Sequence, residues 1–119
     1  MKMTIAREDG DIVNVAVAGA ITQRELNTDT DPLGELLGPA GYARKVMLDL
    51  GNVSYLDSSG VGWLLKCHKR MRQQGGRMVL HSFSPVVSNT IRVLKLEKVL
   101  DIAETVDAAN LLARGGVTQ

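Results

Sequence analysis

Residues 45–74 read KVMLDLGNVSYLDSSGVGWLLKCHKRMRQQ, and this stretch determines the class of fold. Its first part, Lys45 to Leu50, is a short apolar run of the kind that forms a buried strand. Its second part, from about Ser59 to Gln74, repeats apolar residues at helical spacing and is followed by two glycines that end a helix. The residues expected to face the sheet are Val61, Leu64, Leu65, His68 and Met71. A strand, a loop and a helix in this order are the unit from which parallel sheets are built.

The residues near the start of the chain predict an antiparallel hairpin. Two β-prone runs, Thr4 to Glu8 and Asp11 to Ala18, are joined at Asp9-Gly10, a dipeptide that accepts the positive φ angles of a tight turn. In the second run valines alternate with smaller or polar residues, which predicts a strand with one strongly apolar face.

Between the hairpin and the central strand, the sequence predicts an interrupted helical segment. Thr22 and Glu25 have the spacing of a capping box, so a helix is expected to begin there. Residues 27–32, NTDTDP, are rich in helix breakers and are expected to interrupt it. A second helical piece is expected from Leu33 to Leu37, ended by residues 38–41, GPAG.

After the central helix, strands and helices continue to alternate. Strands are expected at Met78 to His81 and at Val99 to Ile102, with a helix from Pro85 between them and a last helix over Val106 to Ala113. The residues of the Pro85 helix expected to face the core are Val86, Val87, Thr90, Ile91 and Leu94. This order predicts a single α/β domain over residues 1–119, with a mixed, mostly parallel sheet, an N-terminal antiparallel hairpin and about four flanking helices.

Composition and charge argue against several classes of function. Of the 119 residues, 45% are hydrophobic and 23% are charged, as in ordinary globular domains. The net charge of +1 gives no broad positive field for nucleic acid. The single cysteine, Cys67, cannot form an internal disulfide, no secretory leader opens the sequence, and the longest apolar stretch is shorter than a membrane helix. A cytoplasmic protein without membrane insertion is expected.

The candidate functional segment is Asp57-Ser58-Ser59-Gly60, which lies between the central strand and its helix. Loops that follow the carboxyl ends of parallel strands are where open α/β folds place their sites. Two hydroxyls and a carboxylate are presented there, and Gly60 and Gly62 keep the surrounding surface low. The bland alternative is that these residues only cap the helix, because Ser and Asp are ordinary N-cap residues.

A longer pattern surrounds this segment: Leu48-Asp49-Leu50 is followed by residues 53–62, VSYLDSSGVG, and the pattern continues through the helix, through residues 77–80 and 94–96, and to residues 99–102. In this pattern the chain resembles the anti-sigma factor antagonists, which have the STAS domain fold. The resemblance therefore covers nearly the whole chain and implies the STAS fold.

The resemblance also implies a function. In this family the serine after the aspartate, here Ser58, is phosphorylated by an anti-sigma factor that is also a serine kinase, and a PP2C-type phosphatase reverses the reaction. Ser59 is the second choice of acceptor. The unphosphorylated form binds the anti-sigma factor and so releases a sigma factor. The protein is then a binding module in signal transduction and in the regulation of transcription, not an enzyme, with no cofactor, and it could form a homodimer.

The residues expected to contact the partner surround this serine. They are Thr22, Asp57, Ser58, Ser59, Gly60, Gly62, Trp63 and Lys66. Members of the family commonly carry an aspartate near the position of Thr22, so this chain has one negative charge fewer beside the site. Trp63 is expected to be substantially exposed, either as a partner-binding anchor or as a ring lying on its own domain. The basic residues Lys66, Lys69, Arg70 and Arg72 are expected on the outer side of the helix, as a solvated face or as a contact for an acidic partner.

Other functions compete less well with this interpretation. A STAS domain could instead sense a small ligand, or serve as a scaffold or regulatory subunit in a signalling or transport assembly. Against a serine hydrolase, the Gly-x-Ser-x-Gly motif is absent and His68 lies roughly 13 Å up the helix from Ser59, although distance does not exclude His81 as a base. Cys67, His68 and His81 lack metal-ligand spacing and are expected to be structural, and no nucleotide-binding glycine motif occurs.

Overall fold

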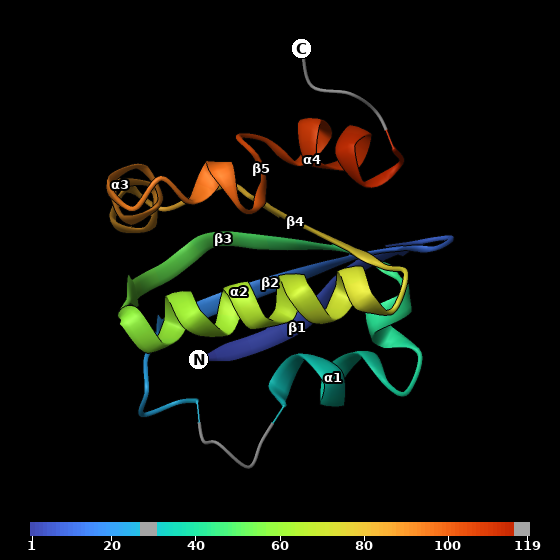
Figure 1. Ribbon diagram of the computed structural model, residues 1–119, viewed down its shortest axis with the longest axis horizontal. Coiled ribbons are helices and arrows are strands. Elements are labelled where there is room, and N and C mark those ends of the chain that lie inside the picture. The colour runs from blue at the N-terminus through green and yellow to red at the C-terminus, as the bar shows by residue number, and fades with distance from the viewer. Residues whose placement is uncertain (27–30, 116–119) are drawn as a thin grey trace.

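The computed structural model describes residues 1–26 and 31–115, which form a five-stranded sheet with helices on both faces (Figure 1). The strands lie in sequence order, and β1 is antiparallel to β2 while all later pairs are parallel. The strands are β1 (Lys2–Asp9), β2 (Ile12–Ile21), β3 (Lys45–Leu56), β4 (Arg77–His81) and β5 (Asp101–Ala103). The α-helices are α1 (Pro32–Leu37), α2 (Ser58–Gln73), α3 (Pro85–Val93) and α4 (Val106–Ala113). Short 3-10 turns at Gly41–Ala43 and Leu96–Lys98 complete the described elements, and the expected α/β class is confirmed.

Alternation along the strands divides the core between the two faces of the sheet. Val13, Val15 and Val17 of β2 pack with buried residues of α1 and α2. Ile12 and Met47 face the other way and pack against α4, where the buried residues are Ala109, Leu112 and Ala113. Figure 1 shows α1 and α2 on one side of the sheet and α4 on the other. The buried residues of α2 run from Gly60 to Met71, so this helix is packed over most of its length, which fixes the position of its first turn.

The central strand is longer than the sequence predicts. β3 continues to Leu56 instead of ending at Leu50, because it stays paired with β2 through two register shifts, between Ala16 and Ala18 and between Gly19 and Ala20. Such irregularities break the two-residue alternation that identifies a strand in sequence. In the extra part, Val53 and Leu56 are buried and Ser54 and Tyr55 are exposed, a spacing of three that resembles a loop.

The helix expected to begin at Thr22 does not form. The backbone N–H groups of Glu25 and Leu26 both donate to the carbonyl of Thr22, at 3.0 Å, which makes a single turn. Residues 27–30 of the expected interruption lie outside the described residues. The second helical piece is confirmed as α1, which begins at Pro32 after the N-cap Asp31.

Two further expectations about the C-terminal half are corrected. In α3, Val87 and Ile91 are buried as predicted, but Val86 and Leu94 are 46% and 53% exposed, because this short helix buries only one narrow stripe of residues four apart. The last strand begins at Asp101, two residues later than predicted, because the preceding 3-10 turn continues to Lys98. Within the described residues, no helix combines the length and apolarity needed to cross a membrane.

Candidate functional site

Ser58 is the first residue of α2 and is exposed. The helix begins here because Asp57 has an extended backbone and its carboxylate Oδ1 accepts a hydrogen bond from the Gly60 N–H at 2.8 Å, which makes Asp57 the N-cap. Ser59, the second helical residue, is partly buried. Of the two serines at this corner between β3 and α2, Ser58, the first choice of acceptor from the sequence, is therefore the more exposed.

Asp57 also ties the start of α2 to the end of β2. Its other carboxylate oxygen, Oδ2, accepts a hydrogen bond from the Gln23 N–H at 3.1 Å, and its own N–H donates to the Ile21 carbonyl at 3.3 Å. These bonds bring Thr22 beside the corner, as the sequence interpretation requires. The Thr22 hydroxyl donates to Glu25 Oε2, so the capping-box partners do meet, although no helix follows them. The sequence did not predict the contact of Gln23, because the bond is made by its backbone N–H, a group that every residue except proline carries.

The two glycines of the first turns have different roles. Gly60 is buried, and a Cβ on it would lie 2.3 Å from the Ile21 carbonyl oxygen and 2.6 Å from Leu56 Cδ1, so the close approach of α2 to β2 requires glycine. Gly62 is exposed, and a Cβ there would meet nothing within 4 Å. Packing therefore explains Gly60 but leaves Gly62 unexplained.

An exposed stripe runs along the outer side of α2 from Ser58. Ser58, Gly62, Lys66 and Lys69 are all exposed and follow one another at helical spacing, so they lie on one side of the helix. Lys66 and Lys69 thus occupy the outward positions predicted from the sequence, as does Arg72, which is also exposed. We call the four residues Ser58, Gly62, Lys66 and Lys69 the α2 stripe.

Trp63 is not substantially exposed, contrary to the expectation. It is partly buried and packs against the main core cluster. Gly60 and Cys67 are buried in addition to the residues expected to face the sheet, which extends the buried side of α2 to the position next to Trp63. Trp63 therefore lies at the edge of the buried arc.

The exposed aromatic residue is Tyr55, at the end of β3. All four aromatic residues of the sequence lie in the described part of the chain. Tyr42 is buried there, Trp63 and Phe83 are partly buried, and Tyr55 is 55% exposed. The sequence signal that could have found it is its place two residues before Asp57, in a segment taken for a loop.

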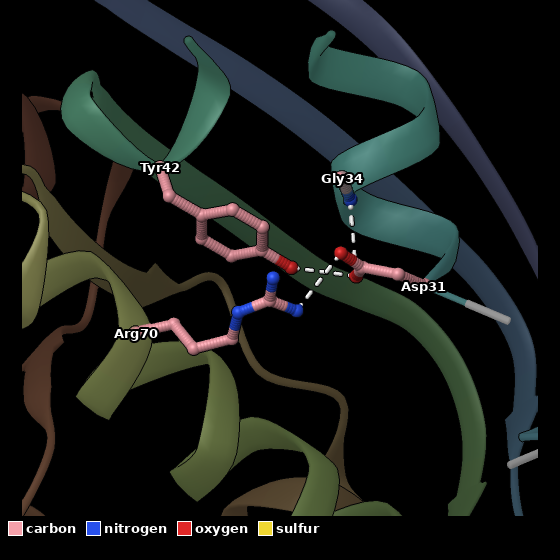
Figure 2. A network of polar contacts seen from close by, with 4 residues as sticks. All are labelled: Asp31, Gly34, Tyr42 and Arg70. Atoms are coloured by element: carbon pink, nitrogen blue, oxygen red, sulfur yellow. Dashed lines mark hydrogen bonds and ion pairs between the residues drawn. The ribbon is translucent and has the colours of Figure 1, made fainter. Parts of the chain in front are cut away.

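Arg70, expected on the solvated face, instead takes part in a network at the far end of α2 (Figure 2). Its Nη1 contacts Asp31 Oδ2 at 3.0 Å, and its guanidinium lies 4.4 Å from the centre of the Tyr42 ring. Asp31 Oδ1 accepts from the Tyr42 hydroxyl at 2.6 Å and from the Gly34 N–H at 3.2 Å. Burial, followed by the hydrogen bond to Asp31, raises the pKa of Tyr42. This network fixes α1 against α2.

The remaining candidate nucleophile and bases, Cys67, His68 and His81, are all buried. Burial, followed by the charge of Asp31, raises the pKa of the Cys67 thiol to about 12, so the thiolate is not available at neutral pH. His81 is fully buried, and its Nδ1 and Nε2 contact Ser82 Oγ at 2.7 Å and Asn14 Oδ1 at 2.9 Å. Both ring nitrogens are therefore engaged away from Ser58, and this arrangement does not support His81 as the base of a serine hydrolase. His68 is buried on α2, and within the described residues no three His, Cys, Asp or Glu side chains form a metal site.

The sequence of this chain is similar to those of known proteins. A model of the STAS domain family matches residues 4–109. BtrV of Bordetella bronchiseptica, which is named provisionally as an anti-sigma factor antagonist, is 30% identical over 116 residues, or 92% of this chain and 91% of BtrV.

Two solved structures share the fold. A Thermotoga maritima protein, described provisionally as an anti-sigma factor antagonist, has a TM-score of 0.78 at 19% identity, over 95% of this chain and 93% of that one. The anti-sigma factor antagonist SpoIIAA, in its unphosphorylated form, has a TM-score of 0.68 at 19% identity, over 98% of this chain and all of that one (100%). The family model and BtrV each match most of the length of this chain. The chain therefore belongs to the STAS domain family, among the anti-sigma factor antagonists.

Proposed function

We propose that this chain, in its unmodified form, binds an anti-sigma factor that is also a serine kinase and thereby releases a sigma factor, and that phosphorylation of Ser58 ends the binding. The single observation that carries the proposal is the exposed position of Ser58 on the first turn of α2, held in place by the Asp57 cap. Kinship with anti-sigma factor antagonists supports the choice of partner.

The environment of Ser58 supports a switch that acts by local charge. A phosphate would add about −1.5 to −2 charges at this position. In the free protein, the positive end of the α2 dipole stabilises the phosphate by about 0.3–1 kcal/mol, so the modified domain stays folded. In a complex, an unpaired buried phosphate costs several kcal/mol, and about 1.4 kcal/mol is a tenfold change in affinity. Phosphorylation then abolishes binding without refolding the domain.

The wider docking surface and the remaining partners belong to the same proposal. We expect contacts from Thr22, Asp57, Ser59, Gly62 and Lys66. Gly60 was also expected to contact the partner, but it is buried against Ile21 and Leu56, so it supports this surface from beneath. Trp63 contributes only its exposed edge, since most of the ring packs on the core. A PP2C-type phosphatase would restore the unmodified form. Residues 1–119 would act as one cytoplasmic STAS domain, alone or as a homodimer.

The test uses the purified chain, ATP and each anti-sigma factor serine kinase encoded in the same genome. Mass spectrometry after incubation is expected to find phosphate on Ser58, and titration calorimetry is expected to find one kinase that binds the unmodified chain. Ser58→Ala should bind this kinase like the wild type, and Ser58→Asp should bind it at least tenfold more weakly. Equal binding of both variants, or phosphate only at other positions, would refute the switch. Failure of every kinase to bind would favour a ligand-sensing or scaffolding STAS domain.

A further inference from the structure

Tyr55 and the other three residues of the α2 stripe flank Ser58 along the chain. Tyr55 precedes it by three residues at the end of β3, and Gly62, Lys66 and Lys69 follow it along the exposed side of α2. The tyrosine is 55% exposed although it belongs to a strand paired with β2 through Ala20. Tyrosine favours strands, but more than half of this residue stays exposed, so packing within the described domain does not account for the aromatic ring.

All these residues lie within the reach of one interface centred on Ser58. A specific interface covers about 800 Å² on each partner, and a round patch of that area has a radius of about 16 Å. Three residues of chain span at most about 11 Å, which places Tyr55 inside the patch. Along the helix, Lys66 is about 12 Å from Ser58 and lies inside the patch, whereas Lys69 is about 16.5 Å away and lies at its rim.

The charge along α2 indicates what kind of surface faces it. Residues 58–73 contain four basic residues and no acidic one, whereas the whole chain has a net charge of +1. Arg70 is paired with Asp31, but Lys66 and Lys69 are exposed and take part in none of the ion pairs found among the described residues. A positive rim steers and orients a partner that carries carboxylates opposite it.

We propose that Tyr55 is the aromatic anchor of the partner interface, and that the surface of the anti-sigma factor kinase facing it combines an apolar pocket for the ring with carboxylates opposite Lys66 and Lys69. This inference rests on the proposed function and assigns the partner contacts beyond the serine corner. Buried aromatic anchors carry much of the energy of such interfaces, while rim charges act mainly on the rate of association.

The variant that tests the anchor is Tyr55→Thr. Threonine keeps a high preference for strands, and the side chain it replaces is exposed, so folding should be little affected. Tyr55→Phe keeps the ring, and Leu111→Ala on α4 removes an equally exposed apolar side chain (64%) far from the start of α2 (Figure 1). Urea unfolding of each variant confirms that the fold is intact before binding is measured.

Titration calorimetry with the kinase that binds the unmodified wild type is expected to give a Kd at least tenfold higher for Tyr55→Thr. Tyr55→Phe and Leu111→Ala should stay within about twofold of the wild type. A folded Tyr55→Thr that binds as well as the wild type overturns the anchor while the proposed function stands. If the wild type binds no kinase, the proposed function itself fails, and the anchor with it.

The acidic surface is tested by association kinetics of the double variant Lys66→Gln/Lys69→Gln. Its association rate should fall severalfold, and should depend less on salt than that of the wild type between about 0.01 and about 0.15 M ionic strength. A matched control, Arg7→Gln/Arg114→Gln, removes the same charge from exposed positions on the α4 side of the sheet and should keep the wild-type salt dependence. If the two double variants behave alike, only net charge matters and the proposed carboxylates are refuted.

Discussion

Asp57 and Gln23 are 34 residues apart in sequence, yet Asp57 Oδ2 accepts a hydrogen bond from the Gln23 N–H at 3.1 Å. The same carboxylate caps α2 through the Gly60 N–H. One side chain therefore starts the helix that carries Ser58 and holds the segment after β2 beside it. The serine corner is preorganised by this side chain, whether or not a partner is present.

Replacing Asp57 by alanine is expected to lower the free energy of unfolding by about 1–2 kcal/mol, because both bonds are lost at once. Asp57→Asn should lose less than Asp57→Ala, because its amide oxygen still accepts from Gly60. Urea unfolding followed by circular dichroism measures both values. A wild-type stability for Asp57→Ala would mean that the cap does not hold this corner.

Gly60→Ala and Gly62→Ala are expected to change stability in opposite directions. At Gly60 the added methyl group meets the Ile21 carbonyl and the Leu56 side chain, and such overpacking costs about 1–3 kcal/mol. At Gly62 there is open space, and replacing a glycine inside a helix by alanine stabilises it by about 0.5–1 kcal/mol. Thermal and urea unfolding of the two variants check the signs.

The same pair of variants separates folding from binding. Gly62→Ala is expected to bind the anti-sigma factor kinase more weakly than the wild type although it is more stable, because the methyl group raises the surface beside Ser58. Tighter or equal binding would place Gly62 outside the interface.

Within the network of Figure 2, Tyr42→Phe is expected to destabilise the protein more than Arg70→Gln. The Tyr42 hydroxyl lies on a buried residue and bonds the Asp31 carboxylate, and bonds to charged groups contribute about 1.5–3 kcal/mol. The Arg70–Asp31 pair is about 40% exposed (43% and 34%), and pairs of this kind contribute about 0–1 kcal/mol. Urea unfolding of the single variants and of each combined with Asp31→Asn isolates the two pairwise energies. A larger pairwise energy for Arg70 would reverse the assignment.

Local patterns predicted the parts of the fold that depend on neighbouring residues. The hairpin follows from Asp9-Gly10, where Gly10 adopts a φ of +62°. The spacing of apolar residues and the two glycines after it predicted α2, and the residue type of Asp57 is one that commonly forms an N-cap. These features are visible in sequence because each involves residues a few positions apart.

The missed features depend on contacts between distant segments. Residues 51–56 form a strand only because β2 shifts register to stay paired with them. The turn at Thr22 remains a single turn, and the next residue, Gln23, bonds Asp57 across the fold. Trp63 was placed outside because the width of the buried arc of α2 is set by the sheet and α1 together. For the same reason the exposed aromatic residue, Tyr55, lay in a segment whose faces could not be assigned.

The free energy of unfolding is expected to fall as the pH is lowered below about 6.5, because two histidines are buried in the folded state. Burial lowers the pKa of both His68 and His81, and the nearby carboxylates of Asp101 and Asp49 offset this only in part. Since the folded pKa values lie below the unfolded value, the unfolded chain binds more protons in this window, and stability present above about pH 6.5 is lost as the pH falls. Urea unfolding between about pH 5.5 and pH 7.5 measures the slope above the range where carboxylates titrate in the unfolded chain.

The double variant His68→Gln/His81→Gln is expected to be less stable than the wild type at every pH, but with a nearly flat profile in that window. His81→Gln alone should remove only part of the slope. His81 also joins β4 to β2 through Asn14, across β3, which ends at Leu56 just before the Asp57 cap. If the double variant keeps the wild-type slope, the proton uptake comes from other groups, and the pKa values of the two histidines are the same in the folded and the unfolded protein.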